Sequence, residues 1–288
     1  MLHRLTLFLV LVAVFIAQAP VAGAAEAKRK TFTFATFNIN WGNPNLKEIA
    51  QVIRQSQADL VALQETNAAS ERFLRAQLGR QYRYAKFLRP TDRYGAGGFG
   101  FLSKVPLKNF SYLKAKDGLF GTWLCEIEPL GHPVQVVNVH LQPFYPLQGD
   151  GLGKAMQMIG RVEAVHVKEI ERIAEQFSKT MPVVVLGDFN SPSMLTTPRF
   201  MAKQGFVDTF AAVTDNADGH PTWQWRFTDR TLSFRLDYIF YRGDFKTVAS
   251  RIVRTEASDH GLVLSKLESV VAAAKAEDPP QAAVRPGD

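Results

Sequence analysis

Short apolar runs in this sequence end in carboxylates, amides and imidazoles. The clearest is VVVLGDFN at residues 183–190, where an unbroken apolar stretch leads through a glycine to Asp188 and Asn190. A β-branched run of this kind predicts a buried strand. Alternation along an extended chain points the side chains of Asp188 and Asn190 the same way. Taken alone, the stretch is equally compatible with a strand that runs into an Asx-type turn.

Similar side chains follow apolar segments elsewhere in the chain, on six separate segments in all. Polar groups at the ends of buried strands cost stability when they lack partners, so their recurrence predicts that they converge on one site. The candidate residues are Asn38, Glu65, His140, Asp188, Asn190, Asp237, Asp259 and His260.

These residue types suit a hard divalent cation, because Mg²⁺ prefers one or two carboxylates together with water and substrate phosphate oxygens. Zinc is less favoured, since Cys125 is the only cysteine and no H-E-x-x-H helix occurs. The sequence also lacks the G-x-S-x-G motif of a serine nucleophile. Two histidines with nearby carboxylates can activate a water, stabilise phosphoryl charge and protonate a leaving group.

The order of the motifs resembles that of the endonuclease/exonuclease/phosphatase superfamily, which includes deoxyribonuclease-I-like nucleases, apurinic endonucleases, inositol phosphatases and neutral sphingomyelinases. The motifs that carry the resemblance are FNIN, LQE, NVHL, GDFN, RLDYIF and SDH, spread over residues 31–268. GDFN and SDH are each a weak signal of this superfamily alone, and together at this separation they are a strong one. The resemblance implies an α+β fold, a four-layered α/β/β/α sandwich with two mixed sheets and the site at one edge of both.

The resemblance also implies a metal site that holds Mg²⁺ or Mn²⁺. Glu65 would be the main ligand, and Asn38 and Asp259 would complete or support the site.

The catalytic residues implied by the resemblance are His140, Asp188, Asn190, Asp237 and His260. His260 would pair with Asp237 and act on the attacking water or the scissile phosphate. Asp188 and Asn190 would orient the nucleophile and the phosphate. His140 would bind the phosphate or serve as the general acid.

Local departures from the family pattern indicate which branches of the superfamily the sequence resembles most. His140 in NVHL resembles the deoxyribonuclease, sphingomyelinase and phosphatase branches more than the apurinic endonucleases. Ser191 follows Asn190 where inositol 5-phosphatases carry an arginine, which argues against that phosphatase branch. Leu262 replaces the proline of the frequent SDH-x-P form, a change expected to affect entry into the strand and not the chemistry.

The net charge of +7 and the pI near 9.5 favour acidic partners such as nucleic acid. DNA is therefore the preferred substrate, and Trp223, Trp225 and Arg226 in TWQWR are candidates to stack on bases or to pack at the site rim. A phospholipid head group is the main alternative, with Phe144 and Tyr145 as a small apolar hairpin. A phosphomonoesterase and a catalytically inactive binding module are further alternatives, although no expected ligand is missing.

The N-terminus predicts export. His3 and Arg4 precede an apolar run, which is followed by the small residues VAGAA. This is the pattern of a cleaved signal peptide over residues 1–25. The run is short for a membrane span, so we expect an extracellular or periplasmic protein with no span after cleavage. We expect one monomeric domain over residues 31–268 and a disordered tail over residues 269–288, which has little to bury.

Periodicity predicts interleaved strands and helices, too irregular for a purely parallel doubly wound sheet. TWQWR at residues 222–226 is expected to form an aromatic loop, and His166 is expected to pack or face solvent on a long helix. The glycine pattern at residues 95–100 lacks the flanking strand and helix of a dinucleotide fingerprint. Strands are expected at 31–40, 59–65, 82–88, 101–103, 119–128, 134–140, 183–190, 206–210, 235–241 and 246–254, and helices at 46–53, 71–78, 156–177 and 198–203.

Overall fold

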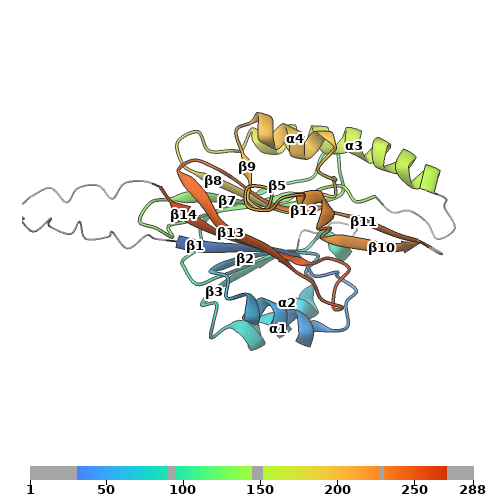
Figure 1. The fold of residues 1–288 in the computed structure, drawn as a ribbon. Coiled ribbons are helices and arrows are strands. Elements are labelled where there is room, and N and C mark those ends of the chain that lie inside the picture. Colours follow the sequence, from blue (N-terminus) through green and yellow to red (C-terminus); the bar gives the residue numbers. More distant parts are fainter. Residues whose placement is uncertain (1–30, 90–94, 145–151, 228–229, 271–288) are drawn as a thin grey trace, which may run out of the picture.

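The computed structural model describes residues 31–89, 95–144, 152–227 and 230–270 (Figure 1). The predicted signal peptide lies outside the described residues, as does the predicted tail beyond residue 270. The last strand ends at Ser269, one residue past the predicted domain boundary, and the amide of Val270 donates to the carbonyl of Asp244 at 3.0 Å. Within the described residues, no helix is long and apolar enough to cross a membrane.

The first sheet has six strands in the order β13-β14-β1-β2-β4-β3. Strands β1 and β2 are parallel, and the other neighbouring pairs are antiparallel, so the sheet is mixed. Its strands are β1 (Thr31–Asn38), β2 (Leu60–Gln64), β3 (Tyr84–Leu88), β4 (Phe99–Ser103), β13 (Phe245–Val253) and β14 (Leu262–Ser269).

The second sheet repeats this plan with six strands in the order β5-β6-β7-β8-β12-β9. Its one parallel pair is β7 with β8, and the remaining pairs are antiparallel. Its strands are β5 (Lys108–Leu113), β6 (Thr122–Ile127), β7 (Val134–His140), β8 (Val183–Asp188), β9 (Val207–Asp208) and β12 (Asp237–Arg242).

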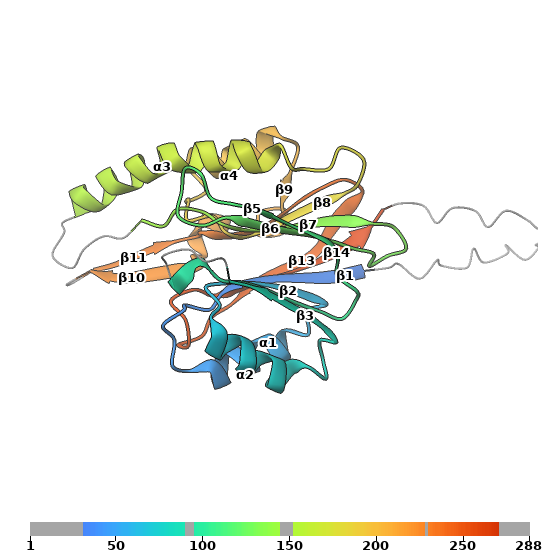
Figure 2. The same ribbon diagram turned by 180° about the vertical axis from the view of Figure 1, so that it is seen from behind.

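The sheets face each other, and helices cover their outer sides (Figures 1 and 2). Helices α1 (Leu46–Ser56) and α2 (Ala68–Leu78) lie under the first sheet, and α3 (Leu152–Ala174) and α4 (Thr196–Lys203) lie over the second. The predicted four-layered α/β/β/α sandwich with two mixed sheets is confirmed. Because each layer buries one apolar face against the next, separate apolar clusters form between the sheets and beneath each helical layer.

The parallel pairs bring polar strand ends to one edge of the sandwich. In the first sheet Asn38 lies opposite Gln64, and in the second His140 lies opposite Asp188. Gly187 precedes Asp188 with φ of +146°, and a Cβ there would lie 2.0 Å from the carbonyl oxygen of Val139. Glycine is therefore required for the two parallel strands to approach this closely next to the site.

Three regions differ from the sequence expectations. The predicted aromatic loop at residues 222–226 is instead strand β10 (Trp223–Phe227), paired with β11 (Arg230–Phe234) in a two-stranded sheet apart from the main sandwich. That prediction was wrong because the tryptophans alternate along an extended chain, the pattern of a strand with one buried face. Strand β5 was not predicted, since KNFSYL has no fully buried position and lies at a sheet edge. Strand β14, which follows His260, was not predicted either.

Candidate active site

A paired aspartate and histidine form the centre of the candidate site. Asp237 begins β12 beside Asp188 at the end of β8, and His260 lies just before β14. His260 Nδ1 donates to Asp237 Oδ2 at 2.8 Å, and His260 Nε2 lies 3.6 Å from Asp188 Oδ2. All three residues are buried, with exposed fractions of 1%, 1% and 6% for Asp188, Asp237 and His260.

This environment fixes the charge of the imidazole. Burial opposes the charged form of His260, but the carboxylates of Asp237 and Asp188 outweigh burial and hold the pKa of the imidazole well above its ordinary value. For Asp188, burial raises the pKa of the carboxyl, and the positive charge of His260 opposes this rise. The two groups therefore share protons as one system, and His260 Nε2 is the nitrogen left to act on a substrate.

Glu65 approaches the same edge from the first sheet. It follows β2 in a left-handed conformation with φ of +61°. Its Oε1 accepts from Asn38 Nδ2 and its Oε2 from the amide of Trp41, both at 3.0 Å. Burial raises the pKa of the Glu65 carboxyl despite these hydrogen bonds. Asn38 Nδ2 also donates to Asp188 Oδ2 at 3.0 Å, so the Asn38 amide joins the carboxylates of both sheets.

His140 lies between the two sheets' carboxylates. Its Nε2 is 3.8 Å from both Glu65 Oε1 and Asp188 Oδ2, and neither ring nitrogen has a hydrogen-bond partner. The ring stacks on Phe120 with centroids 4.1 Å apart. Burial, and then the charge of His260, lowers the pKa of His140 to about 3. A buried imidazole with unpaired nitrogens next to carboxylates is aimed at a ligand rather than satisfied by the fold.

Asp259 and Asn190 are tied to neighbouring chain segments. Asp259 Oδ1 accepts from Asn40 Nδ2 at 3.1 Å, and its Oδ2 accepts from the indole of Trp223 at 3.2 Å. Asn190 Nδ2 donates to the carbonyl of Leu141 at 3.1 Å, and its amide donates to Asp188 Oδ1 at 2.9 Å. The structure thus brings seven predicted residues into direct contact, Asn190 among them through its bond to Asp188. Asp259 joins them through Asn40, whose backbone amide donates to Asn38 Oδ1 at 3.0 Å.

The donor set fits a hard cation. Asp188, Asp237 and His260 offer possible ligand atoms within 4.8 Å of one another. The proton on His260 favours its pairing with Asp237 over metal binding, since a protonated nitrogen has no lone pair to give. Glu65 keeps 14% of its side chain exposed and stands next to Asn38, so its carboxylate is the more open oxygen donor. Oxygen donors of this kind suit Mg²⁺ or Mn²⁺.

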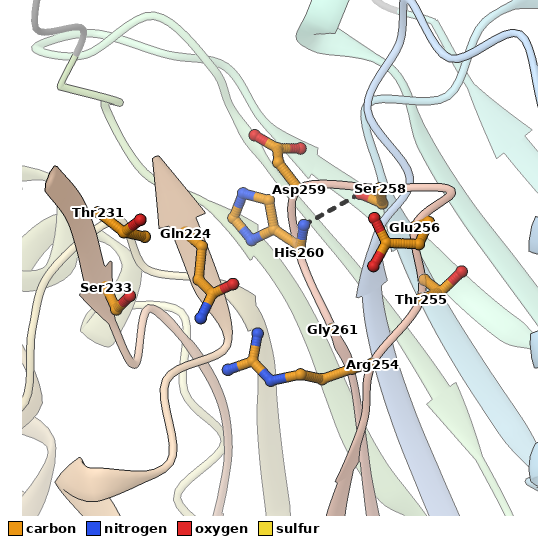
Figure 3. Close-up of a pocket in the computed structure, with 10 residues that line it drawn as sticks. All are labelled: Gln224, Thr231, Ser233, Arg254, Thr255, Glu256, Ser258, Asp259, His260 and Gly261. Carbon is orange, nitrogen blue, oxygen red and sulfur yellow. Dashed lines mark hydrogen bonds between the residues drawn. The ribbon is translucent and has the colours of Figure 1, made fainter. Parts of the chain in front are cut away.

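A polar cleft of about 740 Å³ opens beside His260 (Figure 3). Asp259, His260 and Gly261 lie at one side, and the β10–β11 hairpin faces them with Gln224 and Thr231. The loop between β13 and β14 completes the lining with residues 254–258 except Ala257. The cleft leaves room for a ligand beside His260.

Sequence reasoning missed several residues that hold this site in place. Asn40 tethers Asp259, and the hydroxyl of Thr222 accepts from the amides of Leu236 and Asp237 at 2.9 and 3.0 Å. Asn40 follows Asn38 with the spacing that Asn190 keeps from Asp188, and this repeat was the available signal. Thr222 gave no signal, because its partners come from a strand whose pairing the sequence did not reveal.

The aromatic residues considered for substrate binding are packed into the fold. Trp223 is 6% exposed, donates to Asp259 and stacks on Trp225 with centroids 6.2 Å apart. Phe144 is 4% exposed and packs edge-on against Trp223. The other half of the proposed apolar hairpin, Tyr145, lies outside the described residues, and the side chain of Arg226 does too. Trp223 and Phe144 therefore support the cleft wall instead of contacting a base or a membrane.

Comparison with known proteins identifies similar folds. Residues 35–260 match a family model described as "Endonuclease/Exonuclease/phosphatase family". An endonuclease/exonuclease/phosphatase from Beutenbergia cavernae DSM 12333 is 19% identical, with a TM-score of 0.67 over 84% of this chain and 72% of that chain. TDP2 from C. elegans is 17% identical, with a TM-score of 0.61 over 84% and 77%. A family protein from Leptotrichia buccalis C-1013-b is 17% identical, with a TM-score of 0.59 over 82% and 99%. No curated protein matches the chain.

Proposed function

The chain belongs to the endonuclease/exonuclease/phosphatase family, and from this premise we propose that it is an exported, divalent-metal-dependent phosphodiesterase that acts on DNA. Family membership and the buried carboxylate–histidine cluster together support the broader activity, phosphoester hydrolysis. The observation that carries the proposal is the hydrogen-bonded pair of Asp237 and His260. His260 Nε2 lies 3.6 Å from Asp188 Oδ2, and Asn38 binds both Asp188 and Glu65.

The pair gives His260 a defined task. Asp237 holds Nδ1, which fixes the ring and directs Nε2 toward the site, as the third member of a catalytic triad orients its histidine. The protonated Nε2 donates to a phosphate oxygen, where charge grows in the transition state. Alternatively, it first gives its proton to Asp188 and then, as a neutral imidazole, accepts a proton from the attacking water. Because His140 is neutral in the free protein, its role is to donate one N–H to the phosphate.

A divalent cation is the remaining component. Glu65 and Asn38 would hold the cation, and Asn38 also binds Asp188. Asp259, which accepts a hydrogen bond from Asn40, would support the site from the side. When bound, the cation polarises the phosphate and makes water a better nucleophile. The test is hydrolysis of bis-nitrophenyl phosphate by the purified mature protein with Mg²⁺ or Mn²⁺. Activity that survives exhaustive chelation unchanged would refute the metal requirement.

Several observations favour nucleic acid over phospholipid. The net charge of +7 attracts a polyanion. Phe144, half of the one apolar hairpin considered for membrane insertion, is buried against Trp223. Plasmid DNA, RNA and sphingomyelin vesicles, assayed side by side, separate the alternatives. Cleavage of DNA alone supports our proposal, and cleavage of sphingomyelin or of a phosphomonoester alone contradicts it. Inactivity toward every substrate would leave the inactive binding module.

The remaining parts of the proposal concern export and assembly. Signal cleavage near residue 25 predicts that protein recovered from the periplasm or the medium begins near residue 26, and N-terminal sequencing checks this. Recovery of uncleaved protein from the membrane fraction would contradict it. We propose a monomer, which sedimentation of the active protein tests directly.

A further inference from the structure

Three ionisable residues on α3 are buried outside the candidate site. Glu163, His166 and Glu169 lie three residues apart, so they share one face of the helix. Their exposed fractions are only 8%, 2% and 7%. Buried charged groups are costly unless they are paired and hydrogen-bonded. Their partners show what this face of the helix does.

His166 and Glu169 hold the segment that follows β7. His166 Nε2 faces the carbonyl oxygen of Gln142 at 2.5 Å, and Glu169 Oε2 accepts from the amide of Gln142 at 3.0 Å. Both backbone polar groups of Gln142 are thus fixed by α3. Gln142 is only two residues past His140, so α3 sets where the chain leaves the site.

Glu163 holds the segment that follows β8. Its Oε2 accepts from the hydroxyl of Ser191 at 2.9 Å, and its Oε1 accepts from the amides of Thr196 and Thr197 at 2.5 and 2.9 Å. Ser191 comes directly after Asn190, which in turn binds the carbonyl of Leu141. The segments after β7 and β8 are therefore fixed to each other and to one helix.

His166 links the two carboxylate-bound segments. Its Nδ1 lies 3.2 Å from Glu163 Oε2 and its Nε2 faces the Gln142 carbonyl, so each ring nitrogen lies next to an oxygen. Burial raises the pKa of Glu163, but hydrogen bonds from His166, Ser191 and Thr197 outweigh burial and lower it. The Glu163 carboxylate is therefore stabilised by the groups that it holds in place.

We propose that Glu163, His166 and Glu169 are positioning residues for the phosphoesterase reaction: they hold the ends of β7 and β8, and thereby place His140 and Asp188 for catalysis. This inference rests on the proposed function. The physical reason is that displacement of catalytic groups by about 1 Å can lower a rate by about 10²-fold. We name the three residues the α3 brace.

The test separates positioning from stability. His166→Gln can satisfy only one of the two acceptors with its amide, so it should lower kcat on bis-nitrophenyl phosphate by about 10-fold or more and leave KM within about 3-fold. Glu163→Gln should retain most of the activity, because its carboxamide has the same shape and can donate to His166 Nδ1 while His166 Nε2 still faces Gln142. Ile170→Val, in the same helix and fully buried, is the control that lowers stability alone.

The placement of His140 can also be read by NMR without an activity assay. The His140 ring signals should move in His166→Gln and not in Ile170→Val. Unmoved His140 signals, or a loss of kcat no greater than in an equally destabilised Ile170→Val protein, would overturn the α3 brace. If the wild type hydrolyses no phosphodiester, the proposed function fails, and the His140 signals still decide whether α3 positions the site.

Discussion

Strands β1 and β2 in the first sheet and β7 and β8 in the second are parallel neighbours flanked by antiparallel strands in the same order. The paired positions at their ends carry different side chains. In the first sheet Gln64 lies between Asn38 and Phe99, whereas in the second Asp188 lies between His140 and Asp237. The same strand arrangement therefore ends in neutral side chains in the first sheet and in ionisable side chains in the second.

Because of this difference, the two sheets contribute different kinds of side chain to the site. Gln64 turns between the sheets, where it binds Thr36 and Asn138, and it contributes no charge. The first sheet supplies its carboxylate one residue later, when the left-handed backbone of Glu65 carries that side chain to the edge. We infer that the first sheet provides the cation ligand, Glu65, and, just before β14, His260, and that the second sheet provides the carboxylates that hold His260.

The helical layers differ in the same way. Beneath the first sheet, α1 buries Ile49, Val52 and Ile53, and α2 buries Leu74 and Leu78. Over the second sheet, the α3 brace adds buried charges to an apolar face. The ends of β7 and β8, which carry ionisable side chains, are thus held by ionisable side chains of α3. We infer that small displacements of these strand ends lower activity more than displacements in the first sheet.

The largest expected effect comes from His260, which precedes β14 of the first sheet and contacts Asp237 and Asp188 of the second. His260→Ala should lower kcat by at least ~10²-fold on bis-nitrophenyl phosphate, because it removes the proton-exchanging group. The Mg²⁺ concentration for half-maximal rate should not change. His132→Ala, whose ring packs near Phe245 in another part of the fold, is the control. Near-wild-type kcat would remove His260 from the mechanism.

The first sheet's carboxylate should show the opposite response. Glu65→Ala should raise the Mg²⁺ concentration for half-maximal rate by at least ~10-fold, since loss of even a ligand's partner has an effect of that size. A Mg²⁺ titration of initial rates measures this, with Glu71→Ala on α2 as the matched carboxylate control. An unchanged Mg²⁺ requirement would break the proposed division between the sheets.

The buried carboxyl of Glu169 predicts how stability changes with pH. Burial raises the pKa of Glu169 from 4.5 to about 7 in the folded protein. Its contribution is then fully present below pH 4.5 and is lost as pH rises through 7. Glu169→Gln, which mimics the protonated form, should therefore be more stable than wild type at pH ~8 by on the order of 2 kcal/mol, and should lose that advantage at pH ~4.5.

Denaturant unfolding of both proteins across this pH range measures the difference. Glu171→Gln, an exposed neighbour on α3, should follow the wild-type pH dependence. A constant difference between wild type and Glu169→Gln at all pH values would show that Glu169 does not titrate in this range.

The smallest effect is expected at the hydrogen bond between the segment after β1 and the segment before β14, two neighbouring strands of the first sheet. Asn40→Ala removes the hydrogen bond to Asp259 Oδ1 and should lower the free energy of unfolding by about 1 kcal/mol. It should lower kcat only a few-fold, since Trp223 still holds Asp259 Oδ2. A kcat loss as large as that of His260→Ala would mean that Asp259 acts in the chemistry and not as support.

Much of the fold and the site could be predicted because strand ends have local signals. The runs that end in His140 and Asp188 are strands, as predicted, and the structure shows that they are neighbours in the sheet. The alternating tryptophans of β10 were a local strand signal, but what packs on them could not be predicted, because Trp223 is buried against Phe144 and Asp259, which come from distant segments. The α3 brace was missed because His166 lies on a helix whose apolar period dominates the pattern.

The sequence by itself determined which residue types stand at which strand ends, since alternation and apolar runs are local properties of the chain. Only the tertiary structure decided which of these groups share a proton or a hydrogen bond. Asp237 lies 23 residues from His260, and Asn38 lies 150 residues from Asp188, yet both pairs are in hydrogen-bond contact. Burial between two sheets then set the charges, because desolvation and neighbouring carboxylates act through space and not along the chain.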